Sequence, residues 1–181
     1  DSNIFVTEIG TGKVTLLTPH HGEQLYAAND IDPRPVPDGI KILLTSNAKN
    51  GYENVALLNV GTKDGVFRPG NMEWLTSDKW EVRGHNFSPS GSQIVFSANV
   101  DGNENIYLRD LATGKSTQLK LTGGVNQPAG AGSAFSEDGS RLLYIHNGPT
   151  DPTDIWFYDI AKHTSLQITH SLLAGIRQED L

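Results

Sequence analysis

Short apolar runs alternate with glycine-rich turns along the whole chain, and this pattern predicts β-strands rather than helices. Residues 94–96 (Ile-Val-Phe) and 155–157 (Ile-Trp-Phe) are two such runs, and each lies within a few positions of Gly, Asn or Asp. Continuous runs of this length suit strands that are covered on both faces. No window keeps a helical spacing of apolar residues, so we expect an almost entirely β-structured chain.

The same order of motifs recurs along the sequence. Residues 87–122 contain Phe-Ser-Pro-Ser-Gly, an apolar run, Asp-Gly-Asn, Ile-Tyr-Leu-Arg-Asp-Leu, Gly-Lys and finally Leu-Thr. Residues 135–169 repeat this order closely, residues 35–76 repeat it more loosely, and residues 1–18 contain only its second half. A repeat of this kind indicates an architecture built from similar units placed side by side.

The period of the repeat identifies the unit. The turn glycines Gly39, Gly91 and Gly139 are separated by 52 residues (39 to 91) and 48 residues (91 to 139). A unit of roughly 40–50 residues with several short strands is the size of a four-stranded propeller blade. We therefore expect an all-β fold, a partial β-propeller of about three and a half blades. The expected parts are a half blade at 1–18, full blades at 19–76, 77–122 and 123–169, and a linker at 170–181.

One blade is longer than the others. Residues 61–71 carry extra turn residues, and we expect them to form a longer hairpin between the last two strands of the blade at 19–76. The first strand of each blade is rich in small residues, at 27–28 (Ala-Ala), Gly84 and 129–132 (Ala-Gly-Ala-Gly). Small residues suit the inner strand beside a propeller axis, where backbones approach closely.

Four residues around the second inner strand are candidates for a functional surface. Trp80, Glu81 and Arg83 enter this strand from a loop, and His85 lies within it. Loops at this position line a propeller face or the mouth of its channel. These residues are therefore candidate channel or face residues, and a purely structural role is the alternative.

Catalytic and metal-binding patterns are missing from the sequence. No serine lies in Gly-x-Ser-x-Gly, and Ser116 comes nearest with Gly114 before it. The six histidines show no i, i+4 pair of the zinc-binding type. Ser136, Asp138 and His146 share one repeat, but the aspartate belongs to the repeated turn, so a triad is disfavoured. We expect no catalytic residue, no cofactor and no metal in this chain.

Composition excludes several classes of partner. The formal charge is −7 with no basic stripe, which argues against nucleic acid, and no apolar segment is long enough to span a membrane. The absence of cysteine excludes disulfides, thiolate metal sites and a cysteine nucleophile. The composition fits the bacterial cytoplasm as well as an exported protein in the periplasm or outside the cell, and it does not choose between them.

The repeats resemble the WD-like propeller repeats shared by TolB-type periplasmic proteins and the prolyl oligopeptidase family of serine peptidases. The likeness rests on Phe-Ser-Pro-x-Gly followed by an apolar strand and Asp-Gly-x-x-x-Ile-Tyr-x-x-Asp-Leu in residues 87–122. Residues 17–23, 74–81 and 167–181 look like the propellers of bacterial dipeptidyl-aminopeptidase or acylaminoacyl-peptidase-like enzymes. In such enzymes a segment like 170–181 leads into an α/β-hydrolase domain.

The resemblance implies a non-catalytic propeller portion of a peptidase-like serine hydrolase. Its expected partners are the hydrolase domain of the parent protein and a peptide substrate that the propeller gates or orients. A TolB-like propeller that binds proteins without chemistry is the alternative. Three and a half blades leave strand edges open, because closed propellers carry about four to eight blades. We therefore expect either a longer parent protein or a homodimer whose two copies complete the ring.

Overall fold

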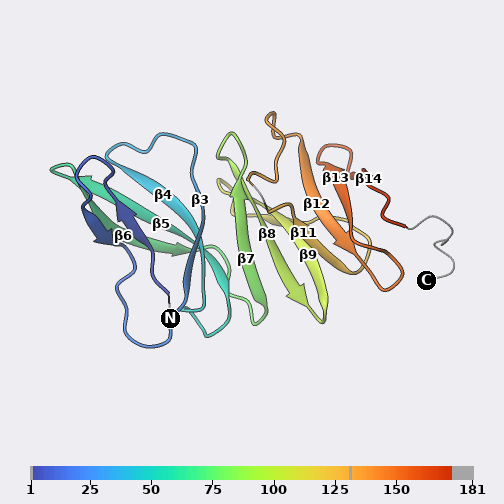
Figure 1. Cartoon of the computed structure of the whole chain (residues 1–181), viewed down its shortest axis with the longest axis horizontal. Helices are drawn as coiled ribbons and strands as arrows, with labels where there is room; N and C mark the ends of the chain where they lie inside the picture. Colours follow the sequence, from blue (N-terminus) through green and yellow to red (C-terminus); the bar gives the residue numbers. More distant parts are fainter. Residues whose placement is uncertain (1, 131, 173–181) are drawn as a thin grey trace.

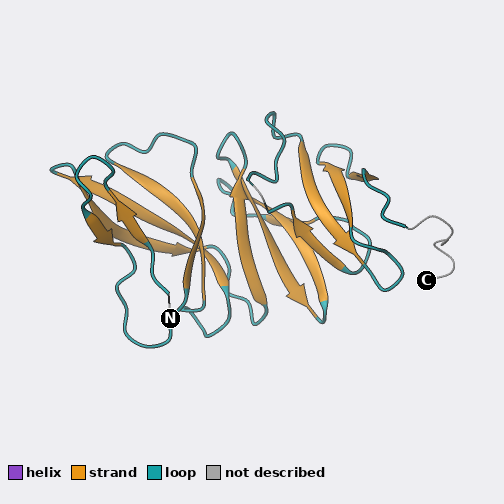
Figure 2. Cartoon of the chain, viewed as in Figure 1, coloured by secondary structure: helices purple, strands orange, loops and turns teal. Residues whose placement is uncertain are grey.

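The computed structural model describes residues 2–130 and 132–172 of the 181-residue chain, and its regular elements are all β-strands (Figures 1 and 2). The all-β prediction is confirmed. No helix long and apolar enough to cross a membrane occurs in the described part of the chain. The strands are β1 (Phe5–Thr7), β2 (Val14–Leu16), β3 (Tyr26–Ile31), β4 (Gly39–Ser46), β5 (Asn54–Lys63), β6 (Val66–Trp74), β7 (Glu81–Phe87), β8 (Gln93–Val100), β9 (Asn103–Asp110), β10 (Ser116–Gln118), β11 (Val125–Pro128), β12 (Arg141–Asn147), β13 (Asp154–Asp159) and β14 (Thr164–Gln167).

These strands form antiparallel sheets in which sequence neighbours pair, as in propeller blades. A two-stranded unit, β1–β2, precedes the four-stranded sheet β3–β4–β5–β6. The strands β7 to β10 and β11 to β14 form two further units in the same order, and one parallel bridge between Val125 and Glu104 joins them. The units follow one another along the long axis of the molecule in chain order (Figure 1).

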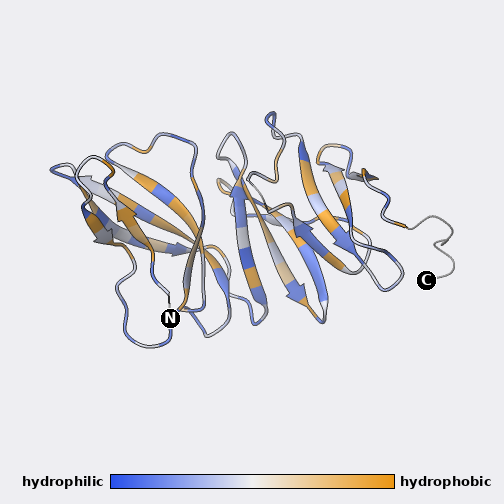
Figure 3. Ribbon diagram, in the orientation of Figure 1, coloured by the Kyte–Doolittle hydropathy of each residue, from blue (hydrophilic) through white to orange (hydrophobic). Residues whose placement is uncertain are grey.

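Hydrophobic clusters fill the spaces between neighbouring units. Ile4 and Leu17 of the first unit pack with Ile42 of β4, and Leu43 packs on the other side of β4 with Val82 of β7. A third cluster joins β8 and β9 to β12 and β13. Figure 3 shows hydrophobic stretches interspersed with hydrophilic ones along the strands. Each fully buried Leu, Ile or Val side chain contributes about 1.5–3 kcal/mol, so the units stabilise one another mainly through these contacts.

The two outermost faces carry exposed apolar side chains. At the β1–β2 end, Phe5 is 56% and Val14 59% exposed, and at the other end Ile155 is 39% and Leu166 55% exposed. The expectation that residues 155–157 are covered on both faces is therefore wrong, whereas residues 94–96 are buried as expected. The reason is that no further sheet among the described residues lies against β13.

The longer hairpin between the last two strands of the 19–76 segment is confirmed. The insertion lengthens β5 and β6 to 10 and 9 residues, joined by a turn at Asp64 and Gly65 with φ of 53° and 74°. The placement of residues 129–132 in an inner strand is wrong, since β11 ends at Pro128. The Ala129 N–H still bonds the Leu143 carbonyl at 3.0 Å, but the chain then leaves the ladder. Residue 131, and residues 173–181 of the expected linker, lie outside the described residues.

Candidate functional site

The inner sides of the three four-stranded units surround a polar pocket of about 480 Å³, which we call the inner-strand pocket. The strands β3 and β7 supply two of its sides, and the segment after β11 supplies the third. Pockets of this size are typical of ligand sites. Its lining residues are mostly polar or small: Ala28, Asn29, Asp30, Gly84, His85, Asn86, Ala129, Gly130, Gly132 and Ser133.

Two β-bulges lie at matching places in the inner strands. The register of β3 shifts between Ala28 and Asp30, and the register of β7 shifts between Gly84 and Asn86. A bulge adds one residue to its strand and re-aims its side chains. The bulges leave Asn29 and His85 without a register partner, and both residues line the inner-strand pocket.

Side-chain oxygens of the pocket tie β3 and β7 each to the unit that follows. A carboxylate oxygen of Asp30 accepts the backbone N–H of Phe87 at 2.8 Å. The amide oxygen of Asn86 accepts the backbone N–H of Ala134 at 3.0 Å. Since both bonds satisfy backbone donors between units, they fix the spacing of the inner strands around the pocket.

The amide groups of the pocket keep their donors uncommitted. The Thr45 hydroxyl donates to Oδ1 of Asn29 at 2.8 Å and accepts the N–H of Gly84 at 3.0 Å. The oxygen of Asn86 is likewise occupied. Among the described residues, the NH₂ groups of Asn29 and Asn86 make no hydrogen bond. An amide nitrogen carries two donors, so the pocket offers donors from two neighbouring strands.

Gly84 lies where β7 approaches β3 closely. A Cβ at this position would lie 3.1 Å from Oδ1 of Asn29 and 3.4 Å from side-chain atoms of Leu43 and Val55. Such contacts are tighter than or at the limit of ordinary packing. The small residue thus allows the close approach of inner strands that the sequence predicts.

His85 is held by a buried polar network. Its Nε2 lies 3.0 Å from the hydroxyl of Ser97, which donates its hydrogen to Glu104 at 2.8 Å. Gln127 of β11 donates to the other carboxylate oxygen of Glu104 at 2.8 Å, and Glu104 is only 7% exposed. Because the single hydroxyl hydrogen of Ser97 is used, Nε2 of His85 is the donor and Nδ1 remains an acceptor.

Burial lowers the pKa of His85 from 6.5 to about 4, although the negative charge of Glu104 opposes this effect and the positive charge of Arg83 reinforces it. The imidazole is therefore neutral near pH 7. In this state the inner-strand pocket combines an imidazole acceptor with the two amide donors and the carboxylate of Asp30. Hydrogen-bond acceptors and donors placed together suit the alternating N–H and C=O groups of a peptide backbone.

The other three candidates lie away from this pocket. Nε of Arg83 is 2.6 Å from a carboxylate oxygen of Glu53, and this hydrogen bond raises the pKa of the arginine. A carboxylate oxygen of Glu81 accepts the backbone N–H of Glu53 at 2.9 Å. Trp80 is 41% exposed just before β7. The structure thus places His85 in the inner-strand pocket and groups Glu81 and Arg83 with Glu53 near the start of β7.

Sequence reasoning missed the polar residues that complete the pocket. Asn29, Asp30, Asn86 and Ser133 occupy three different repeats, and none belongs to the repeated motif. Their only shared signal is a short polar side chain in or just after an inner strand. Because a bulge reverses the direction of the following side chains, strand alternation alone does not reveal which of them face the pocket.

The residues of the disfavoured triad do not come together. Ser136 donates to Asp138 at 2.6 Å, whereas His146 is 2% exposed and bonds the amide oxygen of Asn126 at 2.9 Å. Hydrogen bonds from Ser136 and Ser140 lower the pKa of Asp138 to about 2. Within residues 2–130 and 132–172, no group of three His, Cys, Asp or Glu side chains is arranged to hold a metal ion.

Comparison with known proteins identifies the family. The sequence model of the dipeptidyl peptidase IV (DPP IV) N-terminal region matches residues 1–153. The chain belongs to this family. It is also similar to the Tol-Pal system protein TolB of Francisella tularensis subsp. holarctica, with 31% identity over 84 residues. That match covers 46% of this chain and only 18% of the length of TolB.

Solved structures share the propeller fold. The putative TolB of Agrobacterium tumefaciens aligns over 93% of this chain and 70% of its own, with 17% identity and a TM-score of 0.60. Dipeptidyl peptidase 4 of Porphyromonas gingivalis aligns over 95% of this chain and 30% of its own, with 13% identity and a TM-score of 0.52. The family member described here is thus a β-propeller module of the DPP IV and TolB type.

Proposed function

We propose that this propeller module orients peptide substrates, and restricts them by size, for a serine hydrolase domain in the same parent protein. The family match over residues 1–153 supports the peptidase context. The inner-strand pocket supports the binding role, because it gathers side chains from three successive units. The module supplies contacts and shape, while the nucleophile, base and acid belong to the hydrolase domain.

The observation that carries this proposal is the set of uncommitted groups in the inner-strand pocket. The NH₂ groups of Asn29 and Asn86 meet the carbonyl oxygens of an extended peptide, and Nδ1 of His85 accepts one of its N–H groups. Ala28 and Ser133 are exposed and leave room beside these groups. Positioning of this kind contributes to catalysis by holding the scissile bond in place.

The test compares two single arginine substitutions in the full-length protein that contains this chain. Ala28→Arg places a large side chain in the inner-strand pocket, and Ala112→Arg places the same side chain in the exposed turn before β10. We expect Ala28→Arg to lower kcat/KM at least tenfold for peptides of six or more residues and to leave aminoacyl-p-nitroanilide hydrolysis unchanged. Equal loss for both substrate sizes, or no loss with the long peptides, contradicts a role in peptide orientation.

The alternative is a propeller that binds protein partners without chemistry. The 31% identity with TolB over 84 residues favours it. The same assay separates the two functions, since a full-length protein that hydrolyses neither peptides nor aminoacyl substrates is not a peptidase. In that case, binding of a protein partner that Ala28→Arg weakens and Ala112→Arg leaves unchanged supports the alternative.

A further inference from the structure

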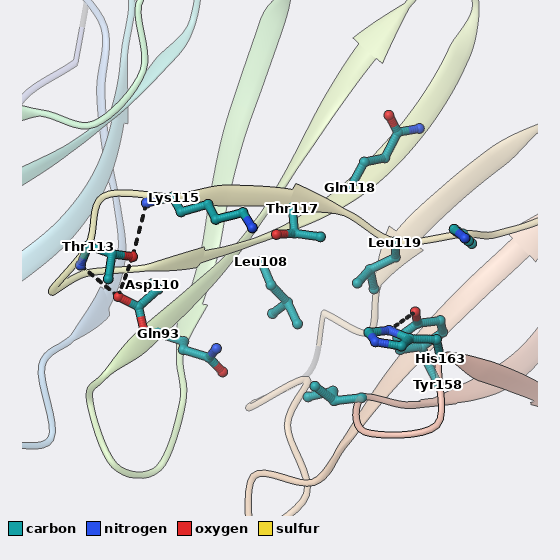
Figure 4. Close-up of a pocket in the computed structure, with 12 residues that line it drawn as sticks. Gln93, Leu108, Asp110, Thr113, Lys115, Thr117, Gln118, Leu119, Tyr158 and His163 are labelled. Carbon is teal, nitrogen blue, oxygen red and sulfur yellow. Dashed lines mark hydrogen bonds between the residues drawn. The ribbon is translucent and has the colours of Figure 1, made fainter.

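A second pocket, about 540 Å³ in volume, lies between the outer strands of the last two units (Figure 4). We call it the outer pocket. Strands β9 and β10 form one side, and the turn between β13 and β14 forms the other. No residue lines both this pocket and the inner-strand pocket. The outer pocket is therefore a different site from the one to which the peptide-orienting role is assigned above.

The floor of the outer pocket is apolar. Leu108, Leu119 and Tyr158 line it and are 7%, 5% and 1% exposed, and they belong to the hydrophobic cluster between the two units. Ile160 packs against the same cluster. Because these side chains already support the fold, the floor is a fixed surface on which an apolar group of a ligand can rest.

The rim of the outer pocket carries hydrogen-bond donors. Lys115 and Lys120 contribute two positive charges, although the chain as a whole has a formal charge of −7. Neither ammonium group has a hydrogen-bond or ion-pair partner in the part of the chain that the structure describes. Asp110 is the one acidic side chain among the lining residues, and its Oδ1 accepts both the N–H and the hydroxyl of Thr113, at 2.7 and 2.8 Å.

His163 adds a further polar side chain to the lining of the outer pocket. Its backbone is left-handed, with φ of 55°, and Nδ1 lies 3.1 Å from the Tyr158 hydroxyl (Figure 4). Burial raises the pKa of Tyr158, and a hydrogen bond with the Lys120 backbone opposes this rise. The hydroxyl of Tyr158 and Nδ1 of His163 share one hydrogen bond, whose direction depends on the imidazole tautomer.

We propose that the outer pocket binds a carboxylate attached to an apolar or aromatic group. The apolar part rests on Leu108, Leu119 and Ile160, and the carboxylate interacts with one of the two ammonium groups of the rim, that of Lys115 or that of Lys120. Charge-assisted hydrogen bonds of this type are stronger than neutral ones. The volume falls within the usual range of small-molecule sites. A free organic acid and the C-terminus of a peptide share this chemistry, so the test includes both.

The test uses methyl-labelled full-length protein and two matched pairs of probes. 4-Phenylbutyrate is compared with 4-phenylbutyramide, and acetyl-Gly-Gly-Phe is compared with its C-terminal amide. We expect each acid to bind at least tenfold more tightly than its amide, with shifts centred on the methyl resonances of Leu108, Leu119 and Ile160. Tighter binding of the phenylbutyrate indicates a free acid as the ligand, and tighter binding of the peptide indicates a C-terminus.

Charge-reversal variants locate the carboxylate. We expect Lys115→Glu combined with Lys120→Glu to weaken binding of the acids at least tenfold and to leave binding of the amides unchanged. Lys13→Glu combined with Lys79→Glu changes the net charge equally at exposed positions outside the outer pocket, and we expect it to have less than a twofold effect. Equal affinity for acids and amides, equal weakening by the two double variants, or shifts confined to other methyl groups overturns the proposal.

Discussion

The hydroxyl of Thr76 donates a hydrogen bond to Oδ1 of Asn54 at 2.8 Å and accepts the backbone N–H of Val55 at 2.9 Å. Oδ1 of Asn54 also accepts the N–H of Asp78 at 2.8 Å, and its NH₂ group donates to the side-chain oxygen of Asn50 at 3.0 Å. Asn54 is fully buried. The threonine thus joins the end of β6, the fourth strand of its unit, to the start of β5, the third strand of that unit.

The same arrangement recurs in the last unit. Thr169 donates to Asp154 at 2.6 Å and accepts the N–H of Ile155 at 2.8 Å. It also occurs at the start of the chain, where Thr18 donates to the amide oxygen of Asn3 at 3.2 Å and accepts the N–H of Ile4 at 2.9 Å. Thr122 makes no such side-chain bond with Asn105 in the described residues, so the repeated Leu-Thr motif has this structural role in some units only.

Removing the Asn54 side chain should destabilise the protein. In Asn54→Ala the Asp78 N–H loses its acceptor and the Thr76 hydroxyl loses a partner, and each buried group left without a partner costs about 1–3 kcal/mol. We expect the free energy of unfolding to fall by about 2–4 kcal/mol, measured by urea denaturation. Asn105→Ala, at the equivalent and partly exposed position of the next unit, is the control. An equal effect of the two substitutions contradicts the role assigned to the threonine contact.

Much of the fold was readable from the sequence because the turns repeat. Gly12 and Gly114 are left-handed at the same turn, with φ of 70° each, and His163 replaces glycine there with φ of 55°. The inner-strand pocket was less readable. The bulges at Asn29 and His85 depend on contacts between units, and no local residue preference marks them. Only His85 of the four candidate residues lines this pocket.

Protonation of His85 should destabilise the fold in mild acid. Its folded pKa of about 4 lies below the ordinary value of 6.5, so the unfolded chain binds the proton first as the pH falls. The part of the unfolding free energy that depends on a neutral His85 is fully present above pH 6.5. It is lost as the pH falls from 6.5 to 4, and the loss is about 2 kcal/mol at pH 5. Unfolding free energies at pH 7.5 and pH 5 measure this change. His85→Gln should reduce the difference by that amount, whereas the exposed His21→Gln should not alter it.

Gly39 should tolerate no side chain, although its φ is not left-handed. A Cβ there would lie 2.1 Å from the carbonyl oxygen of Val60 and 3.2 Å from the Cα of Gly61, which are backbone atoms of the paired strand. We expect Gly39→Ala to destabilise the protein by about 1–3 kcal/mol, because β4 and β5 must separate. Gly61→Ala is the matched control, since its nearest neighbour would be 3.9 Å away. A thermal-denaturation comparison in which both variants match the wild type would refute the steric argument.

We propose finally that two copies of the isolated 181-residue chain pair through their exposed end faces. Phe5 and Val14 at one end and Ile155 and Leu166 at the other are apolar and exposed, and a closed ring would protect the adjoining strand edges. In a longer parent protein further blades would cover the same faces.

Sedimentation velocity over a range of concentrations tests this pairing. We expect the chain to form a dimer at high concentration and Leu166→Glu to shift it to monomer, because a charge buried in the contact without a partner is costly. Ile31→Glu is the control, since Ile31 is equally exposed at 55% but lies on β3, away from both ends. The pairing is contradicted if the wild-type chain remains monomeric at high concentration, or if Leu166→Glu leaves the dimer intact. Further blades of a parent protein would then be the cover for these faces.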